Sequence, residues 1–390
     1  MNNAKLIAGL KKYTMIIALV VITMFFAWRT GGKILFPMNV TNLIAQNAYV
    51  YVLATGMLLC ILTGGNIDLS VGSVVCFVGA VGGKMLEQGF NVWVSVLAML
   101  IVGLIIGAFQ GYWIAYQKVP PFIATLAGML AFRGLSNVVL NGMTVSITNK
   151  TFINVFGGGS DCYVPDFLNG GAINLTCMAV GVLACLIYIV IQARDRMDRI
   201  KKGYEADPIG STIVKAVLIC AVILAFSYKL AMNKGIPTAL IWIAIVILFY
   251  GYITTKTRIG RYLYAIGGNE KATKLSGINT ERVYFIAYAN MGMLAGLAGI
   301  LTIARMTSAQ PTYGQGYEMD AIGSCFIGGA SAYGGIGSVS GVVVGATLMG
   351  VINLGMSIMG VDANYQKVVK GLVLLFAVIF DVLSKKENSK

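Results

Sequence analysis

The sequence lacks histidine altogether and is poor in charge: charged side chains make up 11% of its 390 residues. Without imidazole, histidine-based catalytic triads, histidine-ligated zinc and imidazole proton relays are excluded. A soluble domain has about 25% charged residues, so this chain has less than half of the usual polar surface. This shortage of charge excludes a soluble enzyme and a disordered chain.

Apolar length is what the sequence has instead, with 57% hydrophobic residues. A helix needs about 20 apolar residues to span a bilayer. The runs that qualify are 13–28, 42–62, 68–84, 93–115, 123–142, 173–192, 212–230, 237–254, 284–304, 339–359 and 365–383. A further run, 319–333, is apolar but short, and it is either a complete short span or a broken helix. The sequence therefore predicts an all-α polytopic membrane protein with ten to twelve transmembrane helices, and residues 1–390 as a single transmembrane domain.

The basic residues are concentrated in a few connecting segments. The N-terminus, 116–122, the charged linker 193–211, the long connection 255–283 and the C-terminal tail together hold 18 of the 29 basic residues. A net charge of +14 would indicate nucleic-acid binding in a soluble protein. In a membrane protein the positive-inside rule and anionic lipid account for it, so we expect no nucleic-acid partner. Both termini are then cytoplasmic, which requires an even number of crossings, and counting 319–333 as a crossing gives twelve.

The seven cysteines show no CxxC spacing, so no metal or redox motif is indicated. Cys162 and Cys177 flank a predicted external loop and are close enough in sequence to pair, but nothing in the sequence requires a disulfide. Lysines before the first apolar run resemble the start of a signal peptide. No cleavage site follows, so we interpret this run as a retained transmembrane helix.

Glycines recur four residues apart in three of the apolar runs. The ladders are Gly103, Gly107 and Gly111, then Gly292 and Gly296, then Gly337, Gly341 and Gly345. A glycine face lets two helix backbones approach closely. The ladders therefore indicate helix packing, and the alternative is that they line a solute path.

The first candidate functional segment is 63–73, where glycines and polar residues interrupt two apolar runs. Unwound backbone at membrane depth is tolerated only when it is buried in protein or lines a cavity. Asp68 and Ser70 are placed to cap the helix that follows. Alternatively, Asn66, Asp68 and Ser70 shape a translocation path or its gate.

The second candidate segment is 257–282, on the predicted cytoplasmic side. Asn269 is placed to cap a short helix over 270–276, with Glu270 and Lys274 as i,i+4 partners and Gly277 as its stop. A capped surface helix suits docking into a groove of another protein; a plain solvated connector is the alternative. The predicted docking residues are Asn269, Glu270, Lys271, Ala272, Lys274, Leu275, Ser276 and Gly277.

The third candidate segment is 305–337, which contains Glu318 and Asp320. Carboxylates at a membrane boundary bind sugar hydroxyls, bind cations or stay in the water layer. Arg133 lies inside an apolar run, where a charge is a functional candidate. Arg133, Glu318 and Asp320 therefore join Asn66, Asp68 and Ser70 as the six candidate residues of the translocation path. The sequence has no GxxxxGK[ST] phosphate loop, so ATP-driven transport would require another chain to hydrolyse the ATP.

Nine ordered segments resemble the membrane permease subunit of bacterial monosaccharide ABC importers, of the ribose, xylose and galactose type. They are NLIAQN (42–47), IDLSVGS (67–73), PFIATLAGMLAFRG (121–134), YAIGGNE (264–270), LSGI (275–278), EMDAI (318–322), IGG (327–329), GGIGS (334–338) and YQKVVKG (365–371). The additional spans around 173–230 resemble the xylose and multiple-monosaccharide branch. Residues 63–66 are a local variant.

The resemblance implies an ABC importer permease fold in the bacterial cytoplasmic (inner) membrane. It implies a homodimer that works with a cytoplasmic sugar ATPase and an extracytoplasmic sugar-binding protein. ATP and magnesium would be bound by that ATPase, and the permease itself would carry no cofactor. The helix at 270–276 would be the coupling helix, and the substrate would be a pentose or hexose such as xylose, arabinose or galactose. An ion-coupled secondary sugar transporter is the alternative function.

Overall fold

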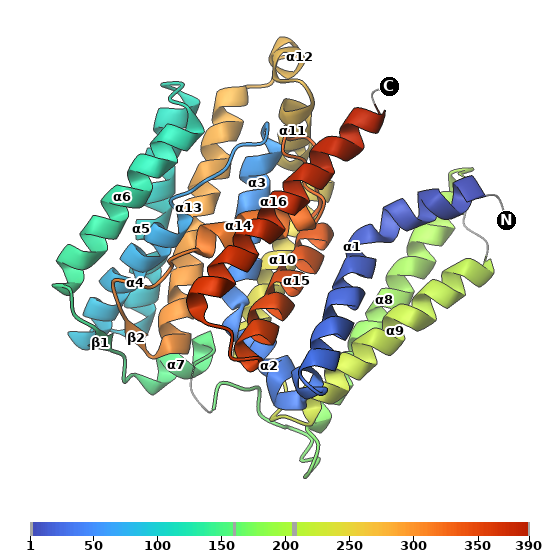
Figure 1. Cartoon of the computed structure of the whole chain (residues 1–390), viewed down its shortest axis with the longest axis horizontal. Helices are drawn as coiled ribbons and strands as arrows, with labels where there is room; N and C mark the ends of the chain where they lie inside the picture. Colours follow the sequence, from blue (N-terminus) through green and yellow to red (C-terminus); the bar gives the residue numbers. More distant parts are fainter. Residues whose placement is uncertain (1–2, 159–160, 205–208, 389–390) are drawn as a thin grey trace. The chain divides into compact units, whose positions relative to one another are not determined.

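A computed structural model describes residues 3–158, 161–204 and 209–388 (Figure 1). The helices are α1 (Asn3–Arg29), α2 (Pro37–Gln46), α3 (Ala48–Leu62), α4 (Val71–Glu87), α5 (Val92–Ala115), α6 (Pro121–Leu140), α7 (Lys150–Phe156), α8 (Leu175–Lys201), α9 (Ile209–Ala231), α10 (Thr238–Lys256), α11 (Arg258–Gly268), α12 (Glu270–Leu275), α13 (Thr280–Met306), α14 (Tyr317–Ile327), α15 (Val339–Ile358) and α16 (Ala363–Asn388). Two short strands, β1 (Val145–Ser146) and β2 (Ser308–Ala309), pair antiparallel. The predicted all-α polytopic class is confirmed. Residues 205–208 of the predicted linker and Lys390 of the predicted tail lie outside the described residues.

Seven of the described helices are long and apolar enough to cross a membrane: α5, α6, α8, α9, α10, α13 and α15. Helices α2 and α3 form an eighth candidate, bent by 43° at a short break. The remaining predicted runs are helical but shorter or more polar. Helix α14 has 11 residues and is therefore roughly 17 Å long, about half the thickness of a hydrocarbon core. Run 319–333 thus does not cross as one helix, which favours the broken-helix interpretation.

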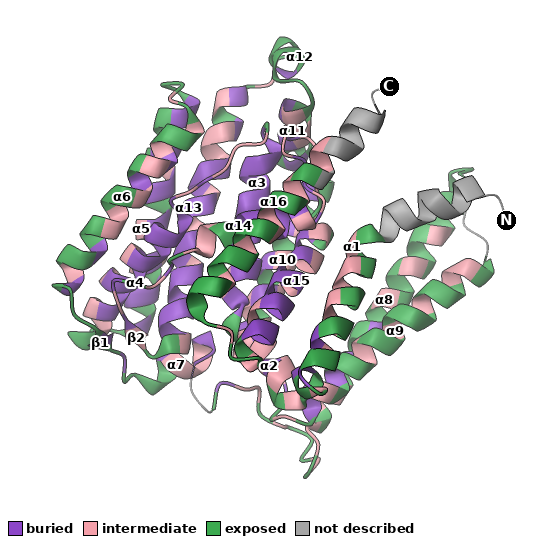
Figure 2. Cartoon of the chain, in the orientation of Figure 1, coloured by how far each residue is buried: buried purple, intermediate pink, exposed green. Residues whose placement is uncertain are grey.

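The described chain divides into two compact units. One contains residues 35–42 and 163–238, with the hairpin of α8 and α9. The apolar side chains of α8 and α9 are largely exposed within this unit (Figure 2), as expected for surfaces that face lipid. The other unit contains the remaining helices, apart from residues 37–42 of α2, and every candidate functional segment named above. Cys162 belongs to the larger unit and Cys177 to the smaller one, and both are buried; their pairing stays an open alternative of the sequence.

Helix α3 is the centre of the larger unit. All of its residues except Tyr49 are buried, as the purple ribbon in Figure 2 shows. A helix that is apolar on every side is stable only when other helices surround it. Helices α13, α14 and α15 pack against it.

The glycine ladders are packing surfaces, as one interpretation of the sequence predicted. A Cβ atom added at Gly103 would lie 2.5 Å from the carbonyl oxygen of Gly292 and 3.1 Å from the Cα of Gly296. The backbones of α5 and α13 are therefore in direct contact. Gly341 and Gly345 similarly face the backbone at the end of α14.

The two ends of α13 contact different sets of loops. Near its start, Glu281 forms an ion pair with Lys118, whose Nζ lies 3.2 Å from Oε1. This pair joins segments 116–122 and 255–283, both of which the charge distribution assigns to the cytoplasm. The end of α3 lies at this same end of α13, because Tyr284 of α13 is hydrogen-bonded to the carbonyl of Thr63. Asp381 of α16 binds the adjoining loop through the N–H of Ala332. Past the other end of α13, β2 pairs with β1 of the predicted external loop (Figure 1).

Candidate functional site

Helix α12 has the capped geometry that the sequence predicted. The Asn269 side chain accepts a hydrogen bond from the Ala272 N–H at 2.9 Å, and Gly277 follows the helix with φ +82°. The buried Thr273 anchors the helix, whereas all eight predicted docking residues are exposed. Leu275 is 89% exposed, so α12 presents an apolar side chain among charged ones.

The charges around α12 are paired differently from the sequence prediction. Instead of pairing with Glu270, Lys274 lies 3.8 Å from Glu281, the carboxylate that also binds Lys118. Glu270 accepts a hydrogen bond from the Tyr284 hydroxyl at 3.2 Å. Helix α12 is therefore tied to α13 rather than stabilised by an internal i,i+4 pair.

The predicted break after α3 lies directly beside this helix. The same Tyr284 hydroxyl is 2.8 Å from the carbonyl oxygen of Thr63. The next carbonyl inward, that of Leu62, accepts from the N–H of Gly335 at 3.1 Å. Asn66 turns back onto Thr63, with Nδ2 at 3.4 Å from its carbonyl oxygen.

The adjoining loop at 331–337 fills the space around this break. Gly65 contacts the carbonyl of Ala332 so closely that no side chain fits there. The Ala332 N–H donates to Asp381 of α16 at 3.1 Å. Backbone of the break after α3 and of loop 331–337 therefore meets side chains of α13 and α16 at the end of the unit that carries α12.

Asp68 and Ser70 form a buried polar network at the start of α4. Oδ1 of Asp68 accepts from the Ser70 N–H at 2.8 Å and from its hydroxyl at 2.6 Å. Gln110 of α5 donates to the same hydroxyl at 2.9 Å. Ser70 occupies the N-cap position without a side-chain capping bond, so Asp68 supports the turn that leads into α4 rather than capping it. Sequence reasoning missed Gln110, although an amide inside an apolar run was the available signal.

Asp320 is completely buried, so the interpretation that it stays in the water layer is wrong. Lys370 of α16 lies 3.0 Å from each of its carboxylate oxygens. The Tyr49 hydroxyl donates to Asp320 Oδ2 at 2.6 Å. An ion pair inside the unit thus joins α14, α16 and the start of α3.

Arg133 and Glu318 lie around the loop that precedes α14. Arg133 donates to the carbonyl oxygens of Tyr313 at 2.6 Å and Pro311 at 3.2 Å. Glu318 packs on Gly72, where an added Cβ would be 2.5 Å from its Oε2. The six path residues predicted from the sequence therefore lie in four separate places. Asn66 lies beside α12, and Asp68 and Ser70 lie at the start of α4. Arg133 and Glu318 lie at the loop before α14, and Asp320 lies in the ion pair with Lys370.

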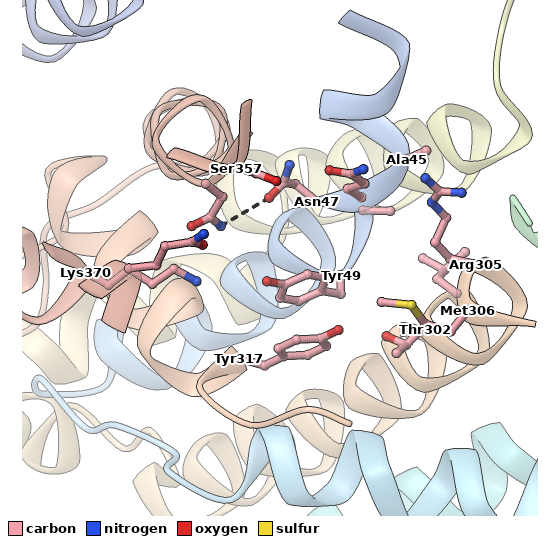
Figure 3. A pocket seen from close by; sticks show the side chains of 14 residues that line it. Ala45, Asn47, Tyr49, Thr302, Arg305, Met306, Tyr317, Ser357 and Lys370 are labelled. Carbon is pink, nitrogen blue, oxygen red and sulfur yellow. Dashed lines mark hydrogen bonds between the residues drawn. The ribbon is translucent and has the colours of Figure 1, made fainter. Parts of the chain in front are cut away.

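The structure adds a polar cavity of about 520 Å³ at the bend between α2 and α3 (Figure 3). The end of α13, the end of α15 and the start of α16 complete its wall. Tyr49 and Tyr317 stack at one side, with ring centroids 3.5 Å apart and planes within 11°. The polar lining includes Asn47, Arg305, Asn353, Gln366 and Lys370.

None of the six predicted path residues lines this cavity. Asp320 approaches it through Tyr49 and Lys370, both of which do. Among the residues that the structure describes, no group of three acidic, cysteine or histidine side chains is arranged to hold a metal ion.

Comparison with known proteins gives a family match over most of the chain. The family model described as "Branched-chain amino acid transport system / permease component" matches residues 39–378. The xylose transport system permease protein XylH of Escherichia coli (strain K12) is 37% identical over 381 residues, which cover 97% of this chain and 94% of that protein. XylH of Haemophilus influenzae is 38% identical over 380 residues, covering 97% and 98%. The ribose import permease protein RbsC of E. coli (strain K12) is 35% identical over 343 residues, covering 88% and 85%. No solved structure matches the chain.

Proposed function

The chain belongs to the permease-component family that matches residues 39–378, and we propose that it is the membrane subunit of an ATP-driven importer of a monosaccharide. It is a multi-pass protein of the bacterial inner membrane and a transport subunit rather than an enzyme. The observation that carries the proposal is the similarity to two xylose permeases, which are 37% and 38% identical to this chain over 97% of its length. The proposed substrate is a pentose or hexose; the relatives that align over most of the chain are named for xylose and ribose, which are both pentoses.

The proposed assembly contains two copies of this chain, a cytoplasmic ATPase and an extracytoplasmic sugar-binding protein. The ATPase would hold ATP and magnesium. Helix α12 is the proposed contact with that ATPase, because its capped backbone is fixed while its outer residues, including Leu275, are exposed. A fixed amphipathic helix is a suitable insert for a groove of a partner protein.

Movement of α12 would reach the membrane through contacts already in place. Glu270 is bonded to Tyr284, and Tyr284 is bonded to the backbone at the break after α3. When the ATPase closes, α12 would displace this end of α13 together with the break. The two permease copies would then alternate between outward and inward opening. Asn66, Asp68 and Ser70 would be carried with the break, whereas Arg133, Glu318 and Asp320 would be path residues outside it.

An ion-coupled secondary transporter is the second candidate, and one observation favours it. Asp320, Lys370 and Tyr49 form a buried titratable set, which is what a proton-coupled carrier uses. The two candidates differ in their energy source, so transport measurements distinguish them.

The deciding experiment uses proteoliposomes that contain the chain together with a sugar ABC ATPase and a sugar-binding protein from the same organism. The binding protein and radiolabelled D-xylose or D-ribose are supplied on one side of the membrane, and ATP is supplied on the other side, where the ATPase lies. Leucine serves as the amino-acid probe. We expect sugar uptake that requires ATP and persists when ionophores remove every ion gradient. Uptake driven by a gradient without ATP would establish the secondary transporter, and uptake of leucine alone would exclude a sugar importer.

A further inference from the structure

We propose that the cavity at the bend between α2 and α3 is a contact site for the sugar, in which amide side chains bind its hydroxyl groups during passage. This inference rests on the proposed function and assigns a place in the chain to its substrate. At about 520 Å³, the cavity falls within the range of roughly 300–1,000 Å³ that is usual for small-molecule sites.

The lining of the cavity matches a polyhydroxylated ligand. Asn353 of α15 faces Asn47 at the bend. Gln366, near the start of α16, also lines the cavity. An amide both donates and accepts hydrogen bonds, as a sugar hydroxyl does. The stacked rings of Tyr49 and Tyr317 add an aromatic surface to this polar wall (Figure 3).

One buried acceptor in this lining points to a ligand. Nδ2 of Asn353 donates to Oδ1 of Asn47 at 3.3 Å, which orients the Asn353 amide. Its own Oδ1 is buried and has no hydrogen-bond partner among the residues that the structure describes. Buried polar atoms are nearly always satisfied, so a hydroxyl donor entering the cavity would complete this one.

The charges in the wall favour a neutral ligand over an amino acid. Asp320 lies 3.0 Å from Lys370 with each carboxylate oxygen and also accepts from Tyr49, so the charge of Lys370 is already compensated, and Arg305 is the second basic residue of the wall. None of the described lining residues is acidic. The ammonium group of an amino acid would therefore find no counter-charge, whereas a neutral sugar needs none.

The position of the cavity agrees with an entry site. Thr302 in its wall lies 21 positions along α13 from Glu281, which is roughly 32 Å at 1.5 Å per residue. The docking helix and the cavity are thus at opposite ends of α13. If α12 faces the ATPase, the cavity lies in the half of the bundle where the binding protein delivers sugar.

The test compares Asn353→Ala and Gln366→Ala with Asn290→Ala in the complete transporter. Asn290 is a matched control because it also lies inside the unit and makes hydrogen bonds, to Tyr250 and to the Ile286 carbonyl, away from the cavity. The measurement is initial uptake of D-xylose and of D-ribose delivered by the same binding protein. Because the binding protein is unchanged, a change in the ratio of the two rates originates in the permease.

We expect each cavity variant to lower D-xylose uptake by roughly tenfold, as for the loss of one polar contact, and to change the xylose-to-ribose ratio. Asn290→Ala should leave the ratio unchanged. If Asn353→Ala does not assemble, the isosteric Asn353→Asp is measured in the same way. Wild-type rates, or lower rates at an unchanged ratio, would overturn the site while leaving the importer intact. Absence of ATP-dependent sugar uptake by the wild-type transporter would instead refute the proposed function.

Discussion

The contact between α5 and α13 allows a stability prediction with an internal control. A Cβ at Gly103 would lie 2.5 Å from the Gly292 carbonyl oxygen, and real Cβ contacts shorter than 3.0 Å are essentially never seen. Gly103→Ala must therefore move the two backbones apart by about 0.5 Å or more, and overpacking of this kind typically costs about 1–3 kcal/mol. Gly134 of α6 is the control because a Cβ there meets nothing within 4 Å.

Both substitutions replace a glycine by alanine within a helix, so the gain of roughly 0.5–1 kcal/mol in helix propensity is common to them. The difference between the variants thus isolates the clash. We expect the free energy of unfolding of Gly103→Ala to be about 1–3 kcal/mol below that of Gly134→Ala. Denaturant unfolding of the purified protein in detergent, followed by circular dichroism, measures this difference. Equal stability of the two variants would refute direct backbone contact between α5 and α13.

Three further predictions concern coupling, the break and the external loop. Glu270→Lys or Gly277→Val should abolish sugar-stimulated ATP hydrolysis in an assembled transporter, and unchanged hydrolysis in both would exclude α12 as the coupling element. Asp68→Ala should lower uptake several-fold more than it lowers the yield of assembled transporter, and wild-type uptake would leave Asp68 only a structural role. Hydrogen bonds from the Gly170 and Thr176 N–H groups, with others nearby, lower the pKa of Asp166 well below its usual range. Because the folded-state pKa is lowered, the carboxylate stabilises loop 163–175 above about pH 4, and this stabilisation is lost as pH falls further. Proteolysis of the loop should increase on acidification in the wild type, whereas Asp166→Asn should already be cleaved faster at neutral pH and should depend little on pH.

Local sequence signals predicted the local structure well. The order Asn269, Glu270, Lys274, Gly277 predicted a capped helix, because an N-cap, first-turn charges and a glycine stop all act within a few residues. The glycine ladders predicted close packing for the same reason, since a spacing of four defines one helical face. Each predicted apolar run coincides largely with one helix or with a pair of consecutive helices.

Contacts between distant residues could not be predicted in this way. Tyr49 and Asp320 are 271 positions apart, and no periodicity connects them. The ion pair of Asp320 with Lys370, and hence the cavity beside it, arises only when α3, α14 and α16 pack together. Sequence reasoning therefore chose polar residues individually and missed the amides that share a wall.

Tyr284 of α13 connects α12 with the break after α3 through its hydroxyl group. A tyrosine hydroxyl has a single proton to donate, and it faces two acceptors, the Thr63 carbonyl at 2.8 Å and the Glu270 carboxylate at 3.2 Å. The two bonds therefore compete. A basic group of a docked ATPase that pairs with Glu270 would leave the hydroxyl to Thr63 and strengthen the hold of α13 on the break. In the proposed importer, engagement of α12 would thus be transmitted to the membrane by redistribution of one hydrogen bond. In Glu270→Lys the hydroxyl has only the Thr63 carbonyl left to bind, so engagement would change nothing at the break, and ATP hydrolysis is expected to lose its response to sugar.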